Sequence, residues 1–162
     1  MARLDGHIFW SLLFLFMKTS LVGLFLPLLA LLAAPAYAVD RVLTIAAPAA
    51  AAPGSDVHVE VTASTTARDG EQIGFLQAEY SVDGGKTWVP VYAENQGKAV
   101  KQAVNFRVGA SGSTASVRVR AAFRGGKAGD VDFAGKPIAW GESWGTWATP
   151  PARKADIPVR SN

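Results

Sequence analysis

The sequence predicts an all-β domain, a two-sheet antiparallel β-sandwich of about seven short strands, behind an N-terminal leader of 38 residues. In the 124 residues from Val39 to Asn162, apolar residues recur mostly at every second position. That spacing is typical of strands with one buried and one wet face. Clusters of glycine, proline and aspartate stand where turns between such strands would be needed.

The first 38 residues follow the pattern of a secretory signal peptide. A basic start at Met17–Ser20 precedes the apolar core Leu21–Leu32, and Ala36-Tyr37-Ala38 provides the small residues of a cleavage site. We therefore expect cleavage between Ala38 and Val39, and a periplasmic or secreted product. We also expect Met17 to be the true start, because Met17–Ala38 alone makes a complete signal.

The alternative for this segment is an uncleaved membrane anchor. Residues 8–34 are apolar over a length that would span the ~30 Å hydrocarbon core of a bilayer. Lys18 would then lie near the middle of the bilayer, at a cost of about 3 kcal/mol. No later apolar run reaches that length, so we expect no membrane span after cleavage.

The composition excludes several kinds of chemistry. The chain has no cysteine, so disulfides, thiolate metal sites and cysteine nucleophiles are excluded. Residues 39–162 carry 14 basic and 12 acidic residues, and a net charge of 14 − 12 = +2 is too small to indicate nucleic-acid binding. The length fits one domain with one core, and the sequence does not indicate an oligomeric state.

Alternating apolar residues place strands near residues 41–46, 55–63, 74–82, 86–92, 99–108 and 115–124, with one or two more in 131–160. The segment Ala46–Ala52 is low in complexity and contains Pro48, which cannot donate to a ladder. We expect it to cross from the first strand to the second or to switch between sheets; a linker is the alternative. The aromatic residues expected to anchor the core are Tyr80, Trp88, Phe106 and Phe123.

Basic residues alternate along the polar faces of two strands that we expect to be neighbours: Arg118, Arg120 and Arg124 on one, Lys101 and Arg107 on the other. Like charges directly opposite each other are destabilising, so Glu60 or Glu79 is expected between them. This stripe is a candidate surface for anionic polysaccharide, lipid head groups or an acidic partner. A solvated face without a partner is the alternative.

Several segments resemble bacterial immunoglobulin-like domains. Val42–Ile45, Pro53-Gly54-Ser55 and Val57–Val61 look like the opening of such a domain, and Phe106–Val108 with Val117–Ala121 resembles its last strands. The resemblance implies an immunoglobulin-like, fibronectin type III-like sandwich over residues 39–162. It implies little about function, because this fold carries many unrelated functions.

A sharper resemblance lies between the third and fourth expected strands. Ser81-Val82-Asp83-Gly84-Gly85-Lys86-Thr87-Trp88 matches the Asp-box pattern Ser-x-Asp-x-Gly-x-Thr-Trp at every fixed position. The resemblance implies a structural role in a hairpin turn for Asp83, Gly85, Thr87 and Trp88. Chemistry points the same way, because Asp83 can accept backbone hydrogen bonds across the turn and glycine takes positive φ. A direct role in ligand binding is the alternative.

Three tryptophans, Trp140, Trp144 and Trp147, lie within eight residues and are separated by glycine, serine, threonine and glutamate. Rigid aromatic rings in a loop can present apolar faces to a sugar or to a partner protein. We therefore take these rings, together with Arg118 and Arg120, as ligand-binding candidates. The alternative is that the rings cover one end or one edge of the sandwich.

Few residues of the expected domain point to catalysis or metal binding. It has one histidine, His58, on the polar face of a strand, and no serine in a Gly-x-Ser-x-Gly elbow. Two acidic pairs, Asp130 with Asp132 and Asp69 with Glu71, offer oxygen ligands but match no calcium-loop pattern. We therefore expect no enzyme activity, no cofactor and no metal.

These observations favour an exported, non-catalytic binding or structural module. It would dock on a protein partner or a cell-envelope component through an edge strand or the tryptophan-rich loop. The alternative is a carbohydrate-binding module that uses Trp140, Trp144 and Trp147 as a stacking platform. The partner is thus expected to be a protein or a polysaccharide, and not a nucleic acid.

Intact mass and N-terminal sequencing of the exported protein test the leader. Because Ala36-Tyr37-Ala38 supplies the cleavage site, the expected product begins at Val39. A product that retains residues 17–38 would contradict cleavage and favour the anchor.

Overall fold

The computed structural model describes residues 38–94 and 97–161, and the segment Val39–Asn162 forms one compact unit. The predicted signal peptide lies outside the described residues except for Ala38, and it stays a prediction. Within the described residues, no helix has the length and apolar character needed to cross a bilayer.

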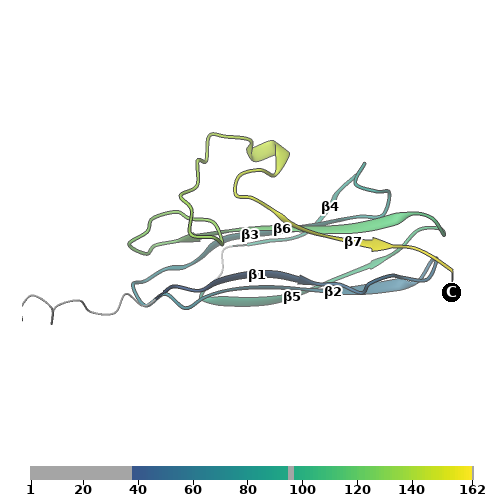
Figure 1. The fold of residues 1–162 in the computed structure, drawn as a ribbon, viewed down its shortest axis with the longest axis horizontal. Helices are drawn as coiled ribbons and strands as arrows, with labels where there is room; N and C mark the ends of the chain where they lie inside the picture. Colours follow the sequence, from purple (N-terminus) through teal and green to yellow (C-terminus); the bar gives the residue numbers. More distant parts are fainter. Residues whose placement is uncertain (1–37, 95–96, 162) are drawn as a thin grey trace, which may run out of the picture. The chain divides into compact units, whose positions relative to one another are not determined.

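The described residues form an antiparallel β-sandwich of seven strands, as the sequence predicts (Figure 1). One sheet has three strands in the order β1-β2-β5, and the other has four in the order β4-β3-β6-β7. Each strand lies within a few residues of its expected place. The strands are β1 (Arg41–Ala46), β2 (Asp56–Thr65), β3 (Gln72–Ser81), β4 (Val89–Glu94), β5 (Ala99–Arg107), β6 (Thr114–Arg124) and β7 (Arg153–Pro158).

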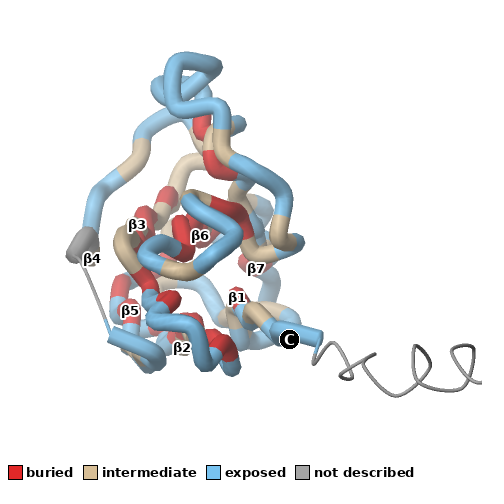
Figure 2. Tube along the Cα trace, turned by 90° about the vertical axis from the view of Figure 1, so that its left-hand side faces the viewer, coloured by how far each residue is buried: buried red, intermediate tan, exposed pale blue. Residues whose placement is uncertain are grey.

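The core lies between the two sheets, where the alternating apolar residues of facing strands meet (Figure 2). Phe123 is fully buried, and the ring of Tyr80 stacks on that of Phe106 at 4.7 Å, so these three core predictions are confirmed. The prediction for Trp88 was wrong. Its ring stacks on Arg118, which projects from the outer face of the four-stranded sheet.

The segment Ala46–Ala52 passes from one sheet to the edge of the other, as expected from Pro48. Ala51 pairs in parallel with Val159, beyond the end of β7. The Ala51 N–H donates to the Pro158 carbonyl, and the Arg160 N–H donates to the Ala51 carbonyl, both at 3.1 Å. The chain therefore covers the last part of the β7 edge with its own backbone.

The expected pairing of the two basic strands was wrong. β6 lies between β3 and β7, whereas β5 pairs with β2 in the other sheet. Consecutive strands of a sandwich often cross between sheets, and alternation within a strand does not reveal its neighbours. Arg118, Arg120 and Arg124 therefore share a face without Lys101 and Arg107.

The long connection between β6 and β7 forms an additional layer. It runs from residue 125 to residue 152, includes the 3-10 turn η1 (Trp144–Thr146), and rises above the four-stranded sheet (Figure 1). Contacts of Arg120 with Trp144 and Trp147 fix it to the outer face of that sheet. This layer brings the tryptophans predicted as a site onto the arginines predicted as a site.

Candidate functional site

Two arginines and three tryptophans alternate in one column on the outer face of the four-stranded sheet. The order along the column is Trp88, Arg118, Trp147, Arg120, Trp144, and we call it the tryptophan–arginine stack. Each guanidinium carbon lies 3.8–4.3 Å from the centres of the two rings beside it. All four distances are well within the ~6 Å range of cation–π attraction.

Strand geometry explains the spacing of the column. Arg118 and Arg120 are two residues apart on β6, so they point to the same face and their Cα atoms lie roughly 7 Å apart. One planar ring fits between two guanidiniums at about that separation, and Trp147 occupies this position. The ring of Trp147 is covered on both faces, and the residue is only 8% exposed.

Arg118 is held by an acidic side chain from the neighbouring strand. Its Nε and Nη2 atoms donate to Glu79 Oε2 at 3.0 and 2.6 Å, and the two residues are directly opposite in the β3–β6 register. Glu79 therefore does not lie between two basic strands, as expected, but opposite Arg118 on β3, because β5 and β6 belong to different sheets. Glu60, the other candidate, instead pairs with Lys101 in the three-stranded sheet.

Arg120 connects the sheet to the tryptophan-rich loop. Its Nε and Nη2 atoms donate to Gln77 Oε1, and its Nη1 atom donates to the carbonyls of Trp144 and Thr149 at 2.9 and 3.1 Å. Arg120 is 2% exposed, so it does not lie on a solvated face as its position suggested. Burial lowers the pKa of its guanidinium, and the negative charge of Glu79 opposes that shift.

The backbone of the loop bends sharply to place Trp147 in the column. Trp147 has a φ of 65°, in the left-handed region that bulky residues rarely adopt. Its N–H donates to the Trp144 carbonyl, which also accepts from Arg120. The two guanidiniums that sandwich the ring offset the strain of this backbone conformation.

Two rings remain partly open at the end of the column. Trp144 is 40% exposed and Trp140 is 36% exposed, with ring centres 5.6 Å apart and planes tilted by 45°. Phe75 packs against Trp144 at 5.2 Å, and Trp140 Nε1 donates to Asp130. Arg124 also donates to Asp130, and this hydrogen bond is the main reason why the pKa of Asp130 is lowered.

The Asp83 turn supports the opposite end of the column. Thr87 and Lys86 donate backbone N–H groups to the Asp83 carboxylate at 3.0–3.1 Å, and the Thr87 hydroxyl donates to it at 2.6 Å. The predicted hydrogen bonds of this aspartate are therefore confirmed. Gly85 has a φ of 88°, and a Cβ there would lie 3.4 Å from the Trp88 ring, which folds back over the turn.

The structure thus brings all nine predicted site residues into one assembly, with Trp140 against Trp144 and Gly85 in the turn beneath Trp88. Trp88, Trp144 and Trp147 alternate with Arg118 and Arg120, while Asp83 and Thr87 build the turn before Trp88. Sequence reasoning missed Glu79 as a direct ligand of Arg118 within the site, and it missed Gln77 and Phe75. Gln77 and Glu79 alternate with apolar residues along β3, and this pattern could have indicated that both side chains lie on the outer face of the sheet.

The other polar candidates are engaged elsewhere. His58 shares a hydrogen bond with Asn105 on the exposed face of the three-stranded sheet. The pair Asp130 and Asp132 does not converge, because Asp132 accepts from the backbone of its own turn at Ala134 and Lys136. Across residues 38–94 and 97–161, no three histidine, aspartate or glutamate side chains are grouped to hold a metal ion.

The second acidic pair is also tied into the fold. Asp69 accepts from the backbone of Lys127 and Glu71, and the Lys127 bond is the main cause of its lowered pKa. Glu71 is buried and binds the Arg41 guanidinium through both carboxylate oxygens. Asp69 thus stabilises a loop, and Glu71 forms an ion pair with Arg41. Neither carboxylate is aimed at an open site.

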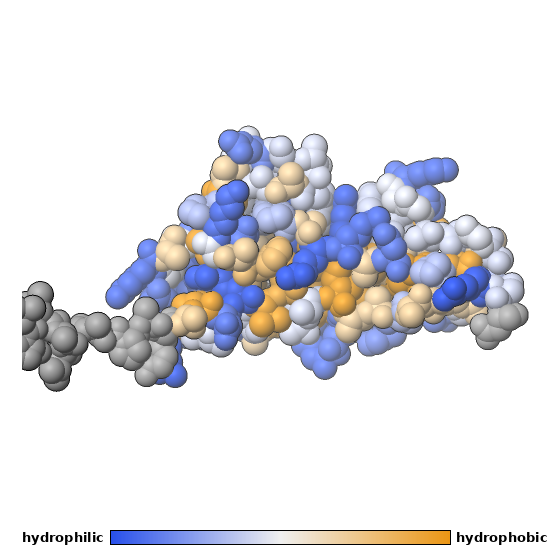
Figure 3. All heavy atoms as spheres, in the orientation of Figure 1, coloured by the Kyte–Doolittle hydropathy of each residue, from blue (hydrophilic) through white to orange (hydrophobic). Residues whose placement is uncertain are grey.

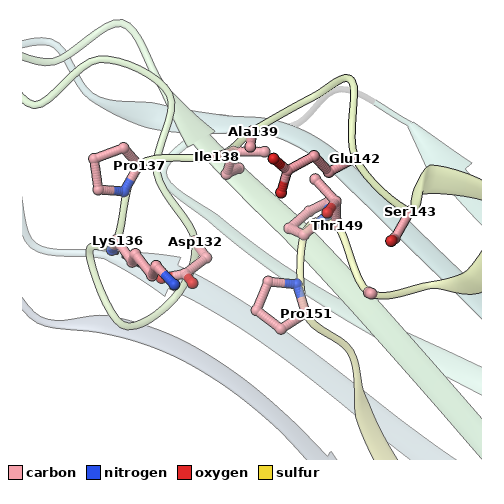
Figure 4. A pocket seen from close by; sticks show the side chains of 11 residues that line it. Asp132, Lys136, Pro137, Ile138, Ala139, Glu142, Ser143, Thr149 and Pro151 are labelled. Carbon is pink, nitrogen blue, oxygen red and sulfur yellow. Dashed lines mark hydrogen bonds between the residues drawn. The ribbon is translucent and has the colours of Figure 1, made fainter.

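A pocket of about 330 Å³ lies inside the additional layer, between the segment 132–143 and the segment 148–151 (Figure 4). Glu142 and Thr149 line one part of it, and Asp132 and Lys136 line another. Prolines and alanines form much of the remaining wall. Nothing in the residue pattern predicts this pocket, because its walls come together only when the loop folds back on itself.

No protein-family model matches the chain, and no curated protein matches it at a significant level.

Replacement of Asp83 by asparagine tests the turn through pH. The Thr87 hydroxyl is the main cause of the lowered pKa of Asp83, with backbone N–H groups adding to it. The stabilisation given by this carboxylate is complete above its unfolded pKa of about 4 and is lost as the pH falls towards its lower folded pKa. We expect D83N to lower Tm at pH 7, and we expect its difference from the parent protein to shrink steadily as the pH falls from about 4 towards 2.

Asp56→Asn is the matched control, since Asp56 makes no side-chain hydrogen bond or ion pair among the described residues. Thermal melts between pH 7 and pH 2 supply the measurement. An equal loss of Tm for D83N and the parent across this range would contradict the assignment.

Replacement of Arg120 by lysine tests the stack. Lysine keeps the charge but lacks the planar fork that reaches Gln77, Trp144 and Thr149 together. We expect R120K to lower the free energy of unfolding by about 2–4 kcal/mol, because several charged hydrogen bonds are lost. Near-ultraviolet circular dichroism should lose tryptophan signal in parallel, whereas R107K at an exposed position of β5 should change neither quantity.

Proposed function

We propose that this chain is an exported, non-catalytic binding module that docks on a protein partner through the exposed rings of Trp140 and Trp144. We call these two rings the tryptophan corner. The observation that carries the proposal is that the two large apolar rings are exposed and yet fixed in place. Arg120 lies under Trp144, Phe75 packs beside it, and Asp130 holds Trp140.

A rigid, exposed tryptophan is well suited to protein recognition. It supplies a large apolar area, and little side-chain entropy is lost on binding when the ring is already held. Tryptophan is also enriched among the residues that dominate binding energy at protein interfaces. Val89 and Val91 on the edge strand β4 are exposed as well, and they follow Trp88 at the other end of the stack. Apolar groups therefore flank the stack at both ends.

The alternative is a carbohydrate-binding module, which the exposure of Trp140 and Trp144 favours. Of the three rings predicted as a stacking platform, Trp147 has a guanidinium on each face. The two open rings are tilted by 45°, so they do not form one flat surface along which neighbouring sugars would stack. The geometry supports the protein partner better.

Several side chains that could take part in chemistry are instead engaged in structural contacts, which supports a binding module. The carboxylates of Glu71, Glu79 and Asp83 each bind a basic side chain or a turn. His58 shares a hydrogen bond with Asn105 of the neighbouring strand, on the exposed face of the three-stranded sheet. These groups build the module, and the proposal gives none of them a part in chemistry.

Capture from the exported fraction of the source cells tests the tryptophan corner. We expect the parent protein to retain a partner that the double variant W140A/W144A loses by at least tenfold. V42A, at another exposed apolar position on β1, is the matched control and should retain the partner. The Tm of each variant shows that the domain remains folded.

A second binding assay distinguishes the protein-binding module from the carbohydrate-binding module. Retardation in gels that contain soluble polysaccharides, lost in W140A/W144A, would replace the protein partner by a carbohydrate. Capture that is equal for the parent and the double variant would contradict a role for the tryptophan corner.

A further inference from the structure

A groove runs along the opposite border of the four-stranded sheet, where β7 faces β1 of the other sheet. It has a volume of about 410 Å³, and we call it the edge groove. Its lining comes from β1 at residues 43–45, from Phe133, and from residues 152–155 at the start of β7. Figure 3 shows apolar atoms exposed along this side of the sandwich between hydrophilic side chains.

The backbone beside the edge groove is unpaired on one side. β1 and β7 are each the last strand of their sheet, so each presents one row of N–H and C=O groups. The Val159 N–H donates to the Ser113 carbonyl and the Val159 carbonyl accepts from Gly112, both on the side of the segment that leads into β6. The Pro158 carbonyl points the other way and accepts from the Ala51 N–H. By the alternation of an antiparallel ladder, the backbone groups of Lys154 and Asp156 also point away from β6.

The chain itself shows that this edge accepts a parallel strand. Ala51 makes two backbone hydrogen bonds to the end of β7, at Pro158 and Arg160. Ahead of Ala51 the chain crosses to β1, which pairs with β2, so it does not continue along β7. The part of the β7 edge at Lys154 and Asp156 is therefore left without a backbone partner among the described residues.

The side chains of the groove define what would fit there. Leu43 is fully buried at its floor, and Ile45 and Ala155 are partly buried beside it, so alternate apolar side chains of a guest would find an apolar surface. Arg153 is exposed on the wall, with its guanidinium 4.4 Å from the centre of the Phe133 ring. No acidic side chain among the described residues pairs with Arg153, whereas Lys154 pairs with Asp156.

We propose that the edge groove binds a short extended segment of another protein, which adds to β7 as a parallel strand. The segment has apolar residues at alternate positions and an acidic residue that meets Arg153. Backbone hydrogen bonds to Lys154 and Asp156 supply affinity, and the groove selects the side chains, as in other cases of strand addition. This surface is separate from the tryptophan corner and does not depend on it.

The direction of strand pairing argues against a second copy of the chain as the occupant. A two-fold pair of identical strands is antiparallel, whereas Ala51 shows parallel addition at this edge. A segment of another protein is free to add in the parallel direction.

A peptide of sequence Glu-Val-Thr-Val-Thr-Val-Glu is the probe for the edge groove. We expect it to bind the parent protein and to slow hydrogen exchange at the amides of Lys154 and Asp156. Its counterpart with lysine at both ends should bind at least tenfold more weakly. R153E should weaken binding of the acidic peptide by about tenfold, whereas R160E, beyond the end of β7, should change it little.

A second pair of variants tests the backbone contact. K154P removes a guest-facing N–H and should abolish slowed exchange at Asp156, whereas K154A keeps the N–H and should retain it. The double variant W140A/W144A should bind the peptide like the parent, which separates this test from that of the tryptophan corner.

Three outcomes would overturn the proposal. The first is equal affinity for the acidic and the lysine-ended peptides. The second is binding that leaves exchange at Lys154 and Asp156 unchanged. The third is a dimer in sedimentation experiments that protects these amides without peptide, which would make a second copy the occupant.

Discussion

The buried guanidinium of Arg120 is the interaction on which the outer half of this molecule depends. A charged group that is almost fully removed from water is stable only if its donors find acceptors. Gln77 supplies one acceptor from the sheet, and the carbonyls of Trp144 and Thr149 supply two from the loop. The same side chain therefore satisfies its own charge and holds a long connection against the sheet.

The stack extends this constraint over the whole outer face. Arg118 and Arg120 lie on one strand at a spacing that admits a single ring, and Trp147 takes that place although its backbone must adopt a left-handed conformation. The Asp83 turn positions Trp88 at one end of the column, and Trp144 ends it at the other. Residues far apart in the sequence thus form one rigid layer over the four-stranded sheet.

This layer changes how the surfaces of the sandwich are used. Much of the face that would be wet in a bare sheet is covered, so Arg118 and Arg120 have structural roles, and Trp140 and Trp144 stay partly open at its end. The border between β1 and β7 keeps unpaired backbone and an apolar floor. These are the two separate surfaces that we propose for partners, one formed by aromatic rings and one by strand edges.

The sequence by itself determined the strands, because a period of two in apolar residues reflects a face buried against a core. It also determined the Asp83 turn, because the hydrogen bonds of the Asp83 carboxylate are all local. Only the tertiary structure decided that β6 pairs with β3 and β7 and not with β5, and that Trp147 lies between Arg118 and Arg120. The tryptophan–arginine contacts join residues distant in the sequence, with 147 − 120 = 27 as the smaller separation. Strand pairing depends on which sheet a strand enters, and alternation along one strand is the same for every choice of neighbour.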